Sequence, residues 1–187
     1  MDAVLEAREY RWQARQDLVL RFHAPVLTLR LNIPGPDKNP PGAEQAFSRL
    51  WDSLLARYRR AFVLYRRLYP APDLIPYLYR EHGTGADGSF QHLVSPLPAF
   101  ELKRLAVDLE ANHPLGRLAD ADVLDVDGRV VSRADMGLPP RACFVCSEQA
   151  ALCRRLGRHR NDELIAFVRE MLEQVLSKTP LAEEKRR

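Results

Sequence analysis

The sequence predicts an α+β fold: a ferredoxin-like or palm-like βαββαβ sheet with one open face, plus an N-terminal helix and a C-terminal Cys-containing segment and helix. Three observations support this prediction. Apolar and polar residues alternate over 26–33, which is the period of a half-buried strand. Amphipathic helix patterns follow at 43–58 and 98–110, and extended segments lie before and after each of them. The resulting order over 26–126 is the split βαβ arrangement, which many unrelated functions share.

Length and composition fit one ordinary soluble domain. The chain has 187 residues, 46% of them apolar and 28% charged, enough to bury a core without help from disulfides or a metal. The single domain is expected to span 1–187, with a core at 26–132 and a C-terminal Cys/His subregion and helix at 139–176. Charged residues interrupt 1–24 and no run of 18 apolar residues exists, so we expect a cytoplasmic protein without signal peptide or membrane helix. The formal net charge of +3 is too small to indicate a nucleic-acid partner.

The N-terminal half is expected to hold a helix, a strand, a second helix and a second strand. Residues 2–22 have the polar, Arg-rich pattern of a surface helix. The strand at 26–33 ends at a Pro-Gly-Pro turn, because proline cannot continue a hydrogen-bonded ladder. The helix at 43–58 repeats apolar residues at i, i+3 and i+4. Residues 61–69 favour a strand through their β-branched and aromatic side chains.

The C-terminal half is expected to begin after a Pro- and Gly-rich loop at 70–88. Its elements are, in chain order, a strand at 89–94, the helix at 98–110, strands at 118–126 and 129–132 around the turn Asp127-Gly128, and a closing helix at 162–176. Asp-Gly between extended segments is a strong hairpin signal, and the proline of His113-Pro114 disfavours continuation of the preceding helix. The charged tail from Lys178 is expected to fray.

Two carboxylates, Asp120 and Asp122, lie two residues apart in the strand expected at 118–126. Side chains at i and i+2 share a face of a strand, so both can bind a hard cation at one place. We expect this to be the open face, because Ala121 and Val123 suit the helix-covered one. Mg²⁺ prefers oxygen ligands and keeps waters and substrate phosphates, so two aspartates suffice as its protein platform. Two such carboxylates repel each other, which favours a bound cation or a neighbouring arginine, and a chance Asp-x-Asp is the alternative.

A cationic loop is expected beside this pair. In the usual form of the sheet the first and fourth strands are antiparallel neighbours, so residues 32–38 would lie next to residues 117–122. A short loop that presents Lys38 and backbone N–H groups can hold the pyrophosphate end of a nucleotide-like substrate, although a merely rigid turn explains it too. Arg30 and Asn32 would lie on the open face of the first strand.

Three runs of sequence resemble one known family. They are 32–38 (Asn-Ile-Pro-Gly-Pro-Asp-Lys), 110–123 (Glu-Ala-Asn-His-Pro-Leu-Gly-Arg-Leu-Ala-Asp-Ala-Asp-Val) and 141–146 (Arg-Ala-Cys-Phe-Val-Cys). They are similar to the apo-citrate lyase phosphoribosyl-dephospho-CoA transferases, the citrate lyase holo-acyl-carrier-protein synthases. The similarity runs from about Arg8 to the final helix. Ala119 departs from the family, which often has an aromatic residue there.

The resemblance implies a nucleotidyltransferase. Its donor would be 2′-(5″-triphosphoribosyl)-3′-dephospho-CoA, and its acceptor a serine of the citrate lyase acyl carrier protein in its apo form. Diphosphate would leave and a phosphodiester would remain. The same chemistry on another carrier protein, such as that of malonate decarboxylase, is an alternative.

Roles follow for residues in the matching runs and for Arg30, which lies just before the first run. Asp120 and Asp122 are expected to hold Mg²⁺, while Lys38 and Arg117 neutralise the departing diphosphate and Arg30 is a weaker candidate. Glu110 and His113 are expected either to orient the serine, to complete the metal shell, or only to cap structure. The substrate-binding candidates are Arg30, Asn32, Gly35, Glu110, His113 and Gly116.

The three cysteines fall close together in the chain. Cys143-x₂-Cys146-x₆-Cys153-x₅-His159 has the composition of a tetrahedral structural zinc site, although the usual two-plus-two spacing is not met. Buried free thiols or a redox pair are the alternatives. The arginines around the last ligands form a basic surface that can meet an acidic carrier protein or the donor's phosphates, or simply face solvent. They are Arg154, Arg155, Arg158 and Arg160.

Two further interpretations stay open at this point. A non-catalytic, zinc-containing adaptor that docks carrier proteins would need the cysteine cluster but neither Asp120 nor Asp122. The arginines of the first helix, Arg8, Arg11 and Arg15, lie on one flank and can reach phosphates or merely face solvent. The isolated histidines, which include His92, are expected to be ordinary surface or core residues.

Overall fold

The computed structural model describes residues 3–177, so the tail from Lys178 and its expected fraying lie outside it. The helices and strands are α1 (Ala3–Phe22), β1 (Val26–Leu31), α2 (Ala43–Leu68), β2 (Tyr79–Gly85), β3 (Gly88–Val94), α3 (Ala99–Asn112), β4 (Ala119–Leu124), α4 (Ala150–Leu156) and α5 (Asn161–Ser177). Two short 3₁₀ turns, η1 (Gly116–Leu118) and η2 (Ala134–Met136), precede and follow β4. Within this range no helix is both long and apolar enough to cross a bilayer.

The four strands form one open antiparallel sheet in the order β2-β3-β1-β4. This confirms the expected α+β class and the expected antiparallel pairing of the first and fourth strands. The register sets Thr28 opposite Asp122 and Arg30 opposite Asp120. On the other side of β1, Thr28 lies opposite His92.

The strand expected at 61–69 is wrong, because α2 continues without a break to Leu68. Leu54, Tyr58 and Phe62 are buried at intervals of four residues, so the apolar face of the helix runs on past the predicted end. Packing of that face against the sheet outweighs the weak strand preference of the individual residues.

The second strand lies instead inside the expected loop, at β2. This edge strand is polar and half exposed, and it pairs with β3 through a tight hairpin in which Gly85 lies opposite Gly88. Gly88 has φ +100°, a conformation that a side chain would strain. Hydrogen bonds to β3 stabilise β2, so this strand forms although its own residues do not show the apolar pattern of a strand.

The hairpin after β4 is smaller than expected. The turn forms, with Gly128 at φ +75° and its N–H donating to the carbonyl oxygen of Asp125 at 3.0 Å. The return segment makes only a single bridge, between Val130 and Leu124, rather than a strand over 129–132.

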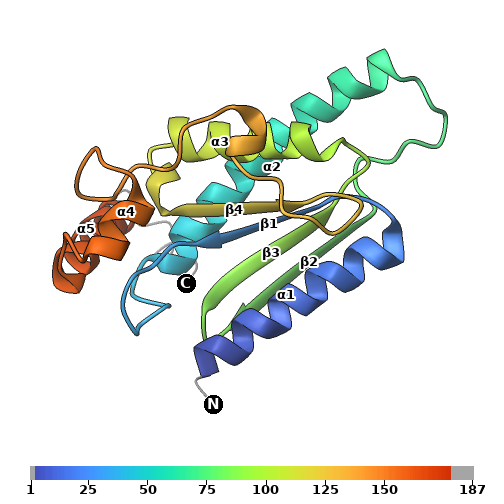
Figure 1. The fold of residues 1–187 in the computed structure, drawn as a ribbon. Helices are drawn as coiled ribbons and strands as arrows, with labels where there is room; N and C mark the ends of the chain where they lie inside the picture. Colours follow the sequence, from blue (N-terminus) through green and yellow to red (C-terminus); the bar gives the residue numbers. More distant parts are fainter. Residues whose placement is uncertain (1–2, 178–187) are drawn as a thin grey trace, which may run out of the picture.

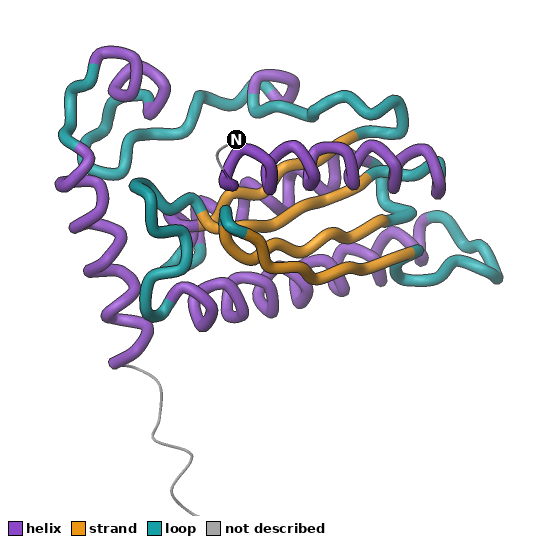
Figure 2. The backbone as a smooth tube through the Cα atoms, turned by 90° about the horizontal axis from the view of Figure 1, so that it is seen from below, coloured by secondary structure: helices purple, strands orange, loops and turns teal. Residues whose placement is uncertain are grey.

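Helices lie on both faces of the sheet (Figures 1 and 2). The main core lies between the sheet and the helices α2, α3 and α5. On the other face, Leu18 and Val19 of α1 pack on Val26, Val94 and Leu124. The face expected to be open is therefore partly covered, because α1 crosses it and contacts β1 and β3.

Candidate active site

The two aspartates of β4 point to the α1 side of the sheet. Ala119, Ala121 and Val123 are buried against the helices on the other side, so the alternation of the strand turns Asp120 and Asp122 away from the main core. Their side chains are 24% and 38% exposed. The acidic pair therefore lies on a surface that a ligand can reach, as the sequence predicts.

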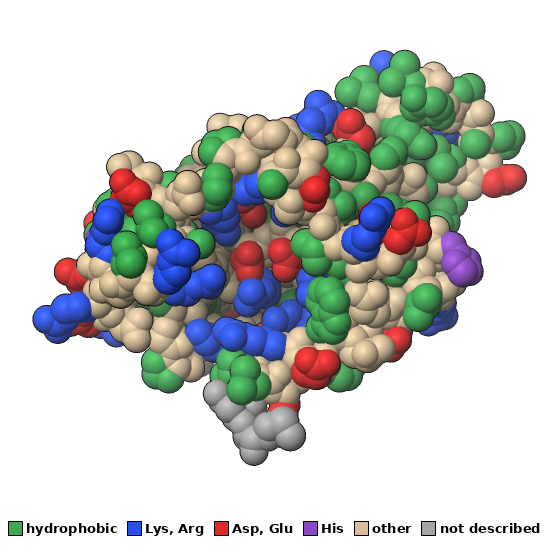
Figure 3. All heavy atoms as spheres, viewed as in Figure 1, with side chains coloured by type: hydrophobic (Ala, Val, Ile, Leu, Met, Phe, Trp, Pro, Cys, Tyr) green, Lys and Arg blue, Asp and Glu red, His purple; other side chains and the backbone are tan. Residues whose placement is uncertain are grey.

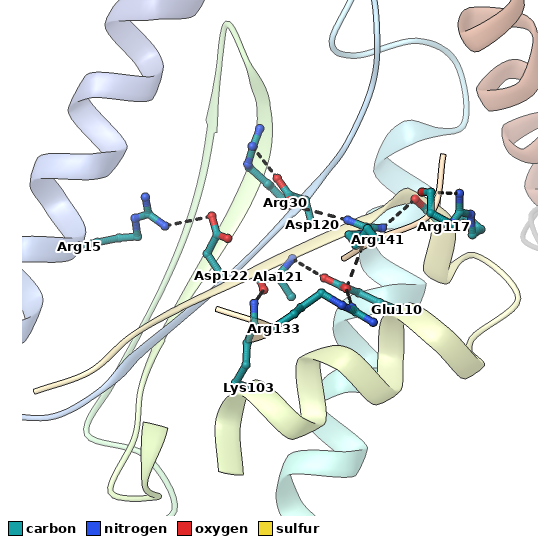
Figure 4. Close-up of polar contacts among 11 residues, drawn as sticks. Arg15, Arg30, Lys103, Glu110, Arg117, Asp120, Ala121, Asp122, Arg133 and Arg141 are labelled. Carbon is teal, nitrogen blue, oxygen red and sulfur yellow. Dashed lines mark hydrogen bonds and ion pairs between the residues drawn. The ribbon is translucent and has the colours of Figure 1, made fainter. Parts of the chain in front are cut away.

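Each carboxylate already has a guanidinium partner. Arg30 of β1 lies 2.5 Å from Asp120, and Arg15 of α1 lies 3.3 Å from Asp122. Arg141 lies 3.9 Å from the second oxygen of Asp120 (Figure 4). The surface view shows acidic groups in a hollow bordered by Lys and Arg side chains (Figure 3). Of the two ways to offset the repulsion between the aspartates, the structure thus shows neighbouring arginines.

The backbone between the aspartates is held from the outer edge of the sheet. The Ala121 N–H donates to Glu110 at 3.4 Å, and the Lys103 ammonium donates to the Ala121 carbonyl oxygen at 3.1 Å. Both side chains come from α3 and are buried. They replace the missing neighbour strand at this edge, so the acidic pair is carried on backbone whose polar groups are satisfied.

Glu110 faces arginines rather than the hollow. One of its carboxylate oxygens lies 2.8 Å from Arg133 and 3.7 Å from Arg141, and its side chain is only 7% exposed. His113 accepts a hydrogen bond from the Leu115 N–H at 3.0 Å, which closes the turn after α3. Burial, assisted by Arg57, lowers the pKa of His113 below its usual value, so the neutral ring is favoured. In this arrangement Glu110 and His113 stabilise the structure around the site.

Lys38 lies in the loop that follows β1. Its ammonium donates to the carbonyl oxygen of Ile33 at 2.7 Å and so closes the Pro-Gly-Pro loop. Partial burial, followed by the charges of Arg8 and Arg30, lowers the pKa of Lys38. Gly35 has φ +83°, and a Cβ there would meet Ile165 of α5 at 2.8 Å, so this glycine allows the loop to dock on α5.

The structure gives Asn32 and Gly116 roles that depend on their backbone atoms. The Asn32 N–H donates to the carbonyl oxygen of Leu118 at 2.8 Å and so extends the pairing of β1 with the segment before β4. A Cβ on Gly116 would lie 2.4 Å from the carbonyl oxygen of Leu109, which leaves no space for a side chain against the end of α3.

Arg117 points away from the aspartates. Its guanidinium donates to the carbonyl oxygens of Ala142, at 3.1 Å, and Cys143, and it lies over the ring of Phe144. Burial, assisted by Arg141, lowers its pKa. The structure thus brings Arg30 next to the acidic pair but turns Arg117 to the cysteine segment.

Of the three arginines of α1 that the sequence leaves between two interpretations, Arg11 and Arg15 are buried, whereas Arg8 is exposed. Arg11 forms a buried ion pair with Asp87, and Arg15 lies over the ring of Trp12 while it contacts Asp122. Burial lowers the pKa of Arg15, although Asp122 opposes the shift. The Nε atom of Arg15 has no hydrogen-bond partner within residues 3–177.

His92 is a buried polar residue of this face that the sequence does not single out. Its Nδ1 lies 2.8 Å from the Thr28 hydroxyl, and its Nε2 has no hydrogen-bond partner in the part of the chain that the structure describes. Burial, with the charges of Arg15 and Arg11, lowers the pKa of His92 to about 3. The ring is therefore neutral at physiological pH, and Thr28 of β1 lies between it and Asp122 in the sheet.

The cysteines and His159 converge as the sequence predicts. The ligand atoms of Cys143, Cys146, Cys153 and His159 all lie within 4.8 Å of one another, and the three thiols are free. In a tetrahedral zinc site with Zn–S bonds of about 2.3 Å, ligand atoms are about 3.8 Å apart, so the group can hold a metal such as zinc. Burial, together with the neighbouring thiols, raises the pKa of Cys153 to about 11.

The fold and the site together define an α+β protein with an acidic pair set among arginines on one sheet face and a Cys₃His group beside it. The model of the apo-citrate lyase phosphoribosyl-dephospho-CoA transferase family matches residues 1–175. The chain belongs to this family and is a transferase.

Individual relatives agree with this assignment. The chain is 34% identical over 179 residues to a probable apo-citrate lyase phosphoribosyl-dephospho-CoA transferase of Streptococcus pyogenes serotype M18, covering 94% of this chain and 86% of the relative. It is 32% identical over 173 residues to the transferase of Escherichia coli O139:H28, covering 92% and 87%. It is also 30% identical over 171 residues to Protein CitXG of Haemophilus influenzae, covering 91% of this chain but only 34% of that longer protein.

Proposed function

We propose that this protein transfers the phosphoribosyl-dephospho-CoA group from 2′-(5″-triphosphoribosyl)-3′-dephospho-CoA to a serine of the citrate lyase acyl carrier protein, with release of diphosphate. The proposal includes a cytoplasmic location and a ferredoxin-like or palm-like reading of the sheet, whose βαββαβ order and β2-β3-β1-β4 arrangement support it. The observation that carries the proposal is the pair Asp120 and Asp122, accessible and surrounded by arginines.

The reaction makes one phosphorus–oxygen bond and breaks another. The serine oxygen attacks the α-phosphorus of the donor, the bond from that phosphorus to the bridging oxygen breaks, and diphosphate leaves with the bonding electrons. The serine proton passes to solvent or to a base. Negative charge grows on the attacking, bridging and leaving oxygens, so the site must supply positive charge at those points.

The acidic pair fits a divalent cation by the chemistry of its donors. Two carboxylates with oxygens on one strand face are the hard ligands that Mg²⁺ takes, with waters and phosphates completing the shell. When bound there, Mg²⁺ would supply Lewis-acid stabilisation of the phosphate and lower the pKa of the attacking hydroxyl.

The surrounding cations supply the rest. Arg15, Arg30 and Arg141 pair with the aspartates, and each presents further N–H donors for phosphate oxygens. We expect Lys38, in the loop after β1, to bind the far end of the triphosphate, and the Pro-Gly-Pro loop that it closes supports this role. We expect the guanidinium groups to exchange carboxylate for phosphate when donor and cation bind together.

Loading of the carrier protein tests this function. The protein is incubated with donor, Mg²⁺ and apo carrier protein, and the mass of the carrier is measured. Asp122→Asn is expected to lower the rate about 100-fold or more, as removal of a comparable electrostatic group does. The matched control is Asp127→Asn, at an exposed position in the turn after β4. Near-normal loading by Asp122→Asn would overturn the assignment, and loading of only a different carrier protein would redirect it to that acceptor.

A further inference from the structure

One short segment carries two of the cysteines and also the arginine that lies near the acidic pair. Residues 141–150, which we call the knuckle, carry Cys143 and Cys146 and lead directly into α4 with Cys153. The knuckle is closed on itself: the Ala150 N–H donates to the Arg141 carbonyl oxygen at 2.9 Å, and the Cys143 N–H donates to that of Glu148 at 2.6 Å. The backbone of Arg141 is thus fixed by the fold of the cysteine segment.

The side chain of Arg141 leaves the knuckle towards the acidic pair. Its guanidinium donates to the carbonyl oxygen of Arg117 at 3.2 Å and lies 3.7 Å from Glu110 and 3.9 Å from Asp120. Arg117 answers from the other side by donating to the carbonyl oxygens of Ala142 and Cys143. Two arginines therefore tie the start of β4 to the knuckle in both directions (Figure 4).

We propose, resting on the function above, that Arg141 binds the triphosphate next to the acidic pair. The Cys₃His group holds Arg141 in place. Arg141 is the residue of the knuckle whose guanidinium lies near Asp120, and 23% of its side chain is exposed. A planar guanidinium held by a backbone carbonyl retains donors that match phosphate oxygens. The cysteine group thereby completes the substrate site, in addition to stabilising the C-terminal segment.

Binding of inorganic tripolyphosphate in the presence of Mg²⁺ tests the role of Arg141 without the acceptor. Calorimetric titration is expected to show binding about 10-fold weaker for Arg141→Gln, because one charge-assisted contact is lost. Arg141→Lys should lie between this variant and the wild type, since it keeps the charge but not the fork. Arg59→Gln, at an exposed position on α2, is the matched control and should bind like the wild type.

A double-mutant cycle tests the link to the cysteine group. Cys146→Ser is expected to lose metal and to weaken tripolyphosphate binding to the level of Arg141→Gln, while the double variant is no weaker than either. His159→Gln, which changes a ligand outside the knuckle, gives the same readout if Cys146→Ser does not fold. Metal content and circular dichroism accompany every titration.

The outcomes separate this inference from the proposed function. If the wild type loads the carrier and binds tripolyphosphate but Arg141→Gln binds equally well, the inference is wrong and the function stands. Equal losses in Arg141→Gln and Arg59→Gln, or additive losses in the cycle, also overturn it. If the wild type neither loads the carrier nor binds tripolyphosphate, the proposed function itself has failed.

Discussion

At the scale of single residues, charge balance decides the arrangement of the site. Two aspartates on one strand face would repel each other, and arginines from α1, from β1 and from the knuckle offset that repulsion. The three cations come from elements far apart in the chain, so the full set exists only in the folded protein. In a site assembled in this way, the N–H groups that would bind phosphate are already in position before a substrate binds. The free-energy cost of ordering them on binding is therefore lower.

His92 is expected to make the protein sensitive to acid. The folded protein keeps the ring neutral down to about pH 3, because burial and the charges of Arg15 and Arg11 disfavour the proton. The unfolded chain takes up that proton near its ordinary pKa of about 6.5. Between these values the unfolded state binds more protons, so the contribution of His92 is complete above about pH 6.5 and is lost as the pH falls towards 3.

His92→Gln should therefore flatten the pH dependence of the unfolding free energy by up to about 1.4 kcal/mol per pH unit between pH 6 and 4. Urea denaturation across this range measures the slope in both proteins. The carboxylates titrate in both and largely cancel in the difference. His82→Gln, on the exposed side of β2, serves as control. Parallel slopes for wild type and His92→Gln would contradict the expected role of this histidine.

At the scale of elements, the sequence predicts those parts whose signal is local. Three local patterns predict which side of an element faces the core, and the structure confirms these sides. They are the alternation of β1, the helical period of α3 and the Asp-x-Asp of β4. The end of α2 and the existence of β2 depend on partners elsewhere in the chain, namely the sheet and β3. Their residues alone therefore indicate the wrong element.

The same reasoning explains which site residues the sequence could indicate. Asp120 and Asp122 declare their common face by spacing, and Arg30 follows from the register of neighbouring strands. No local pattern predicts that Arg141 lies near Asp120 or that Lys103 donates to the Ala121 carbonyl oxygen, because both contacts depend on tertiary packing. The direction of Arg117 is likewise set by the cysteine segment that folds against it.

The docking of α1 is expected to depend on one buried ion pair. The side chains of Arg11 and Asp87 are 6% and 1% exposed, and α1 has only a short apolar contact near its C-terminal end. Arg11→Gln leaves the Asp87 carboxylate buried without its cation, so we expect a loss of about 3–5 kcal/mol in unfolding free energy.

Chemical denaturation measures this loss. Arg59→Gln, at an exposed position of α2, should change stability by less than about 0.5 kcal/mol. Adding Asp87→Asn to Arg11→Gln should recover part of the loss, because the unpaired charge is removed. A stability of Arg11→Gln close to that of the control would show that the ion pair does not hold α1.

At the scale of the whole molecule, the C-terminal third brings three cysteines and one histidine together in the segment that also carries Arg141. Cys143 and Cys153 are buried, while Cys146 and His159 are half-buried, and their ligand atoms lie close enough for one tetrahedral ion. Burial alone would raise the pKa of Cys143, but hydrogen bonds from the backbone N–H groups of Val145 and Cys146 bring it below its ordinary value. Such donors favour the thiolate, which is the form that binds metal.

We therefore expect protein purified from zinc-replete cells to retain about one equivalent of zinc after washing with a mild chelator. Metal analysis measures the stoichiometry, and Cys153→Ser should reduce it to a small fraction. Because ligand binding to the folded state adds to its stability, stripping the metal with a strong chelator should also lower the melting temperature, and adding zinc should restore it. Less than about a tenth of an equivalent in the washed wild type would leave the four residues as a cluster of free thiols and a histidine, and Arg141 would then need another anchor.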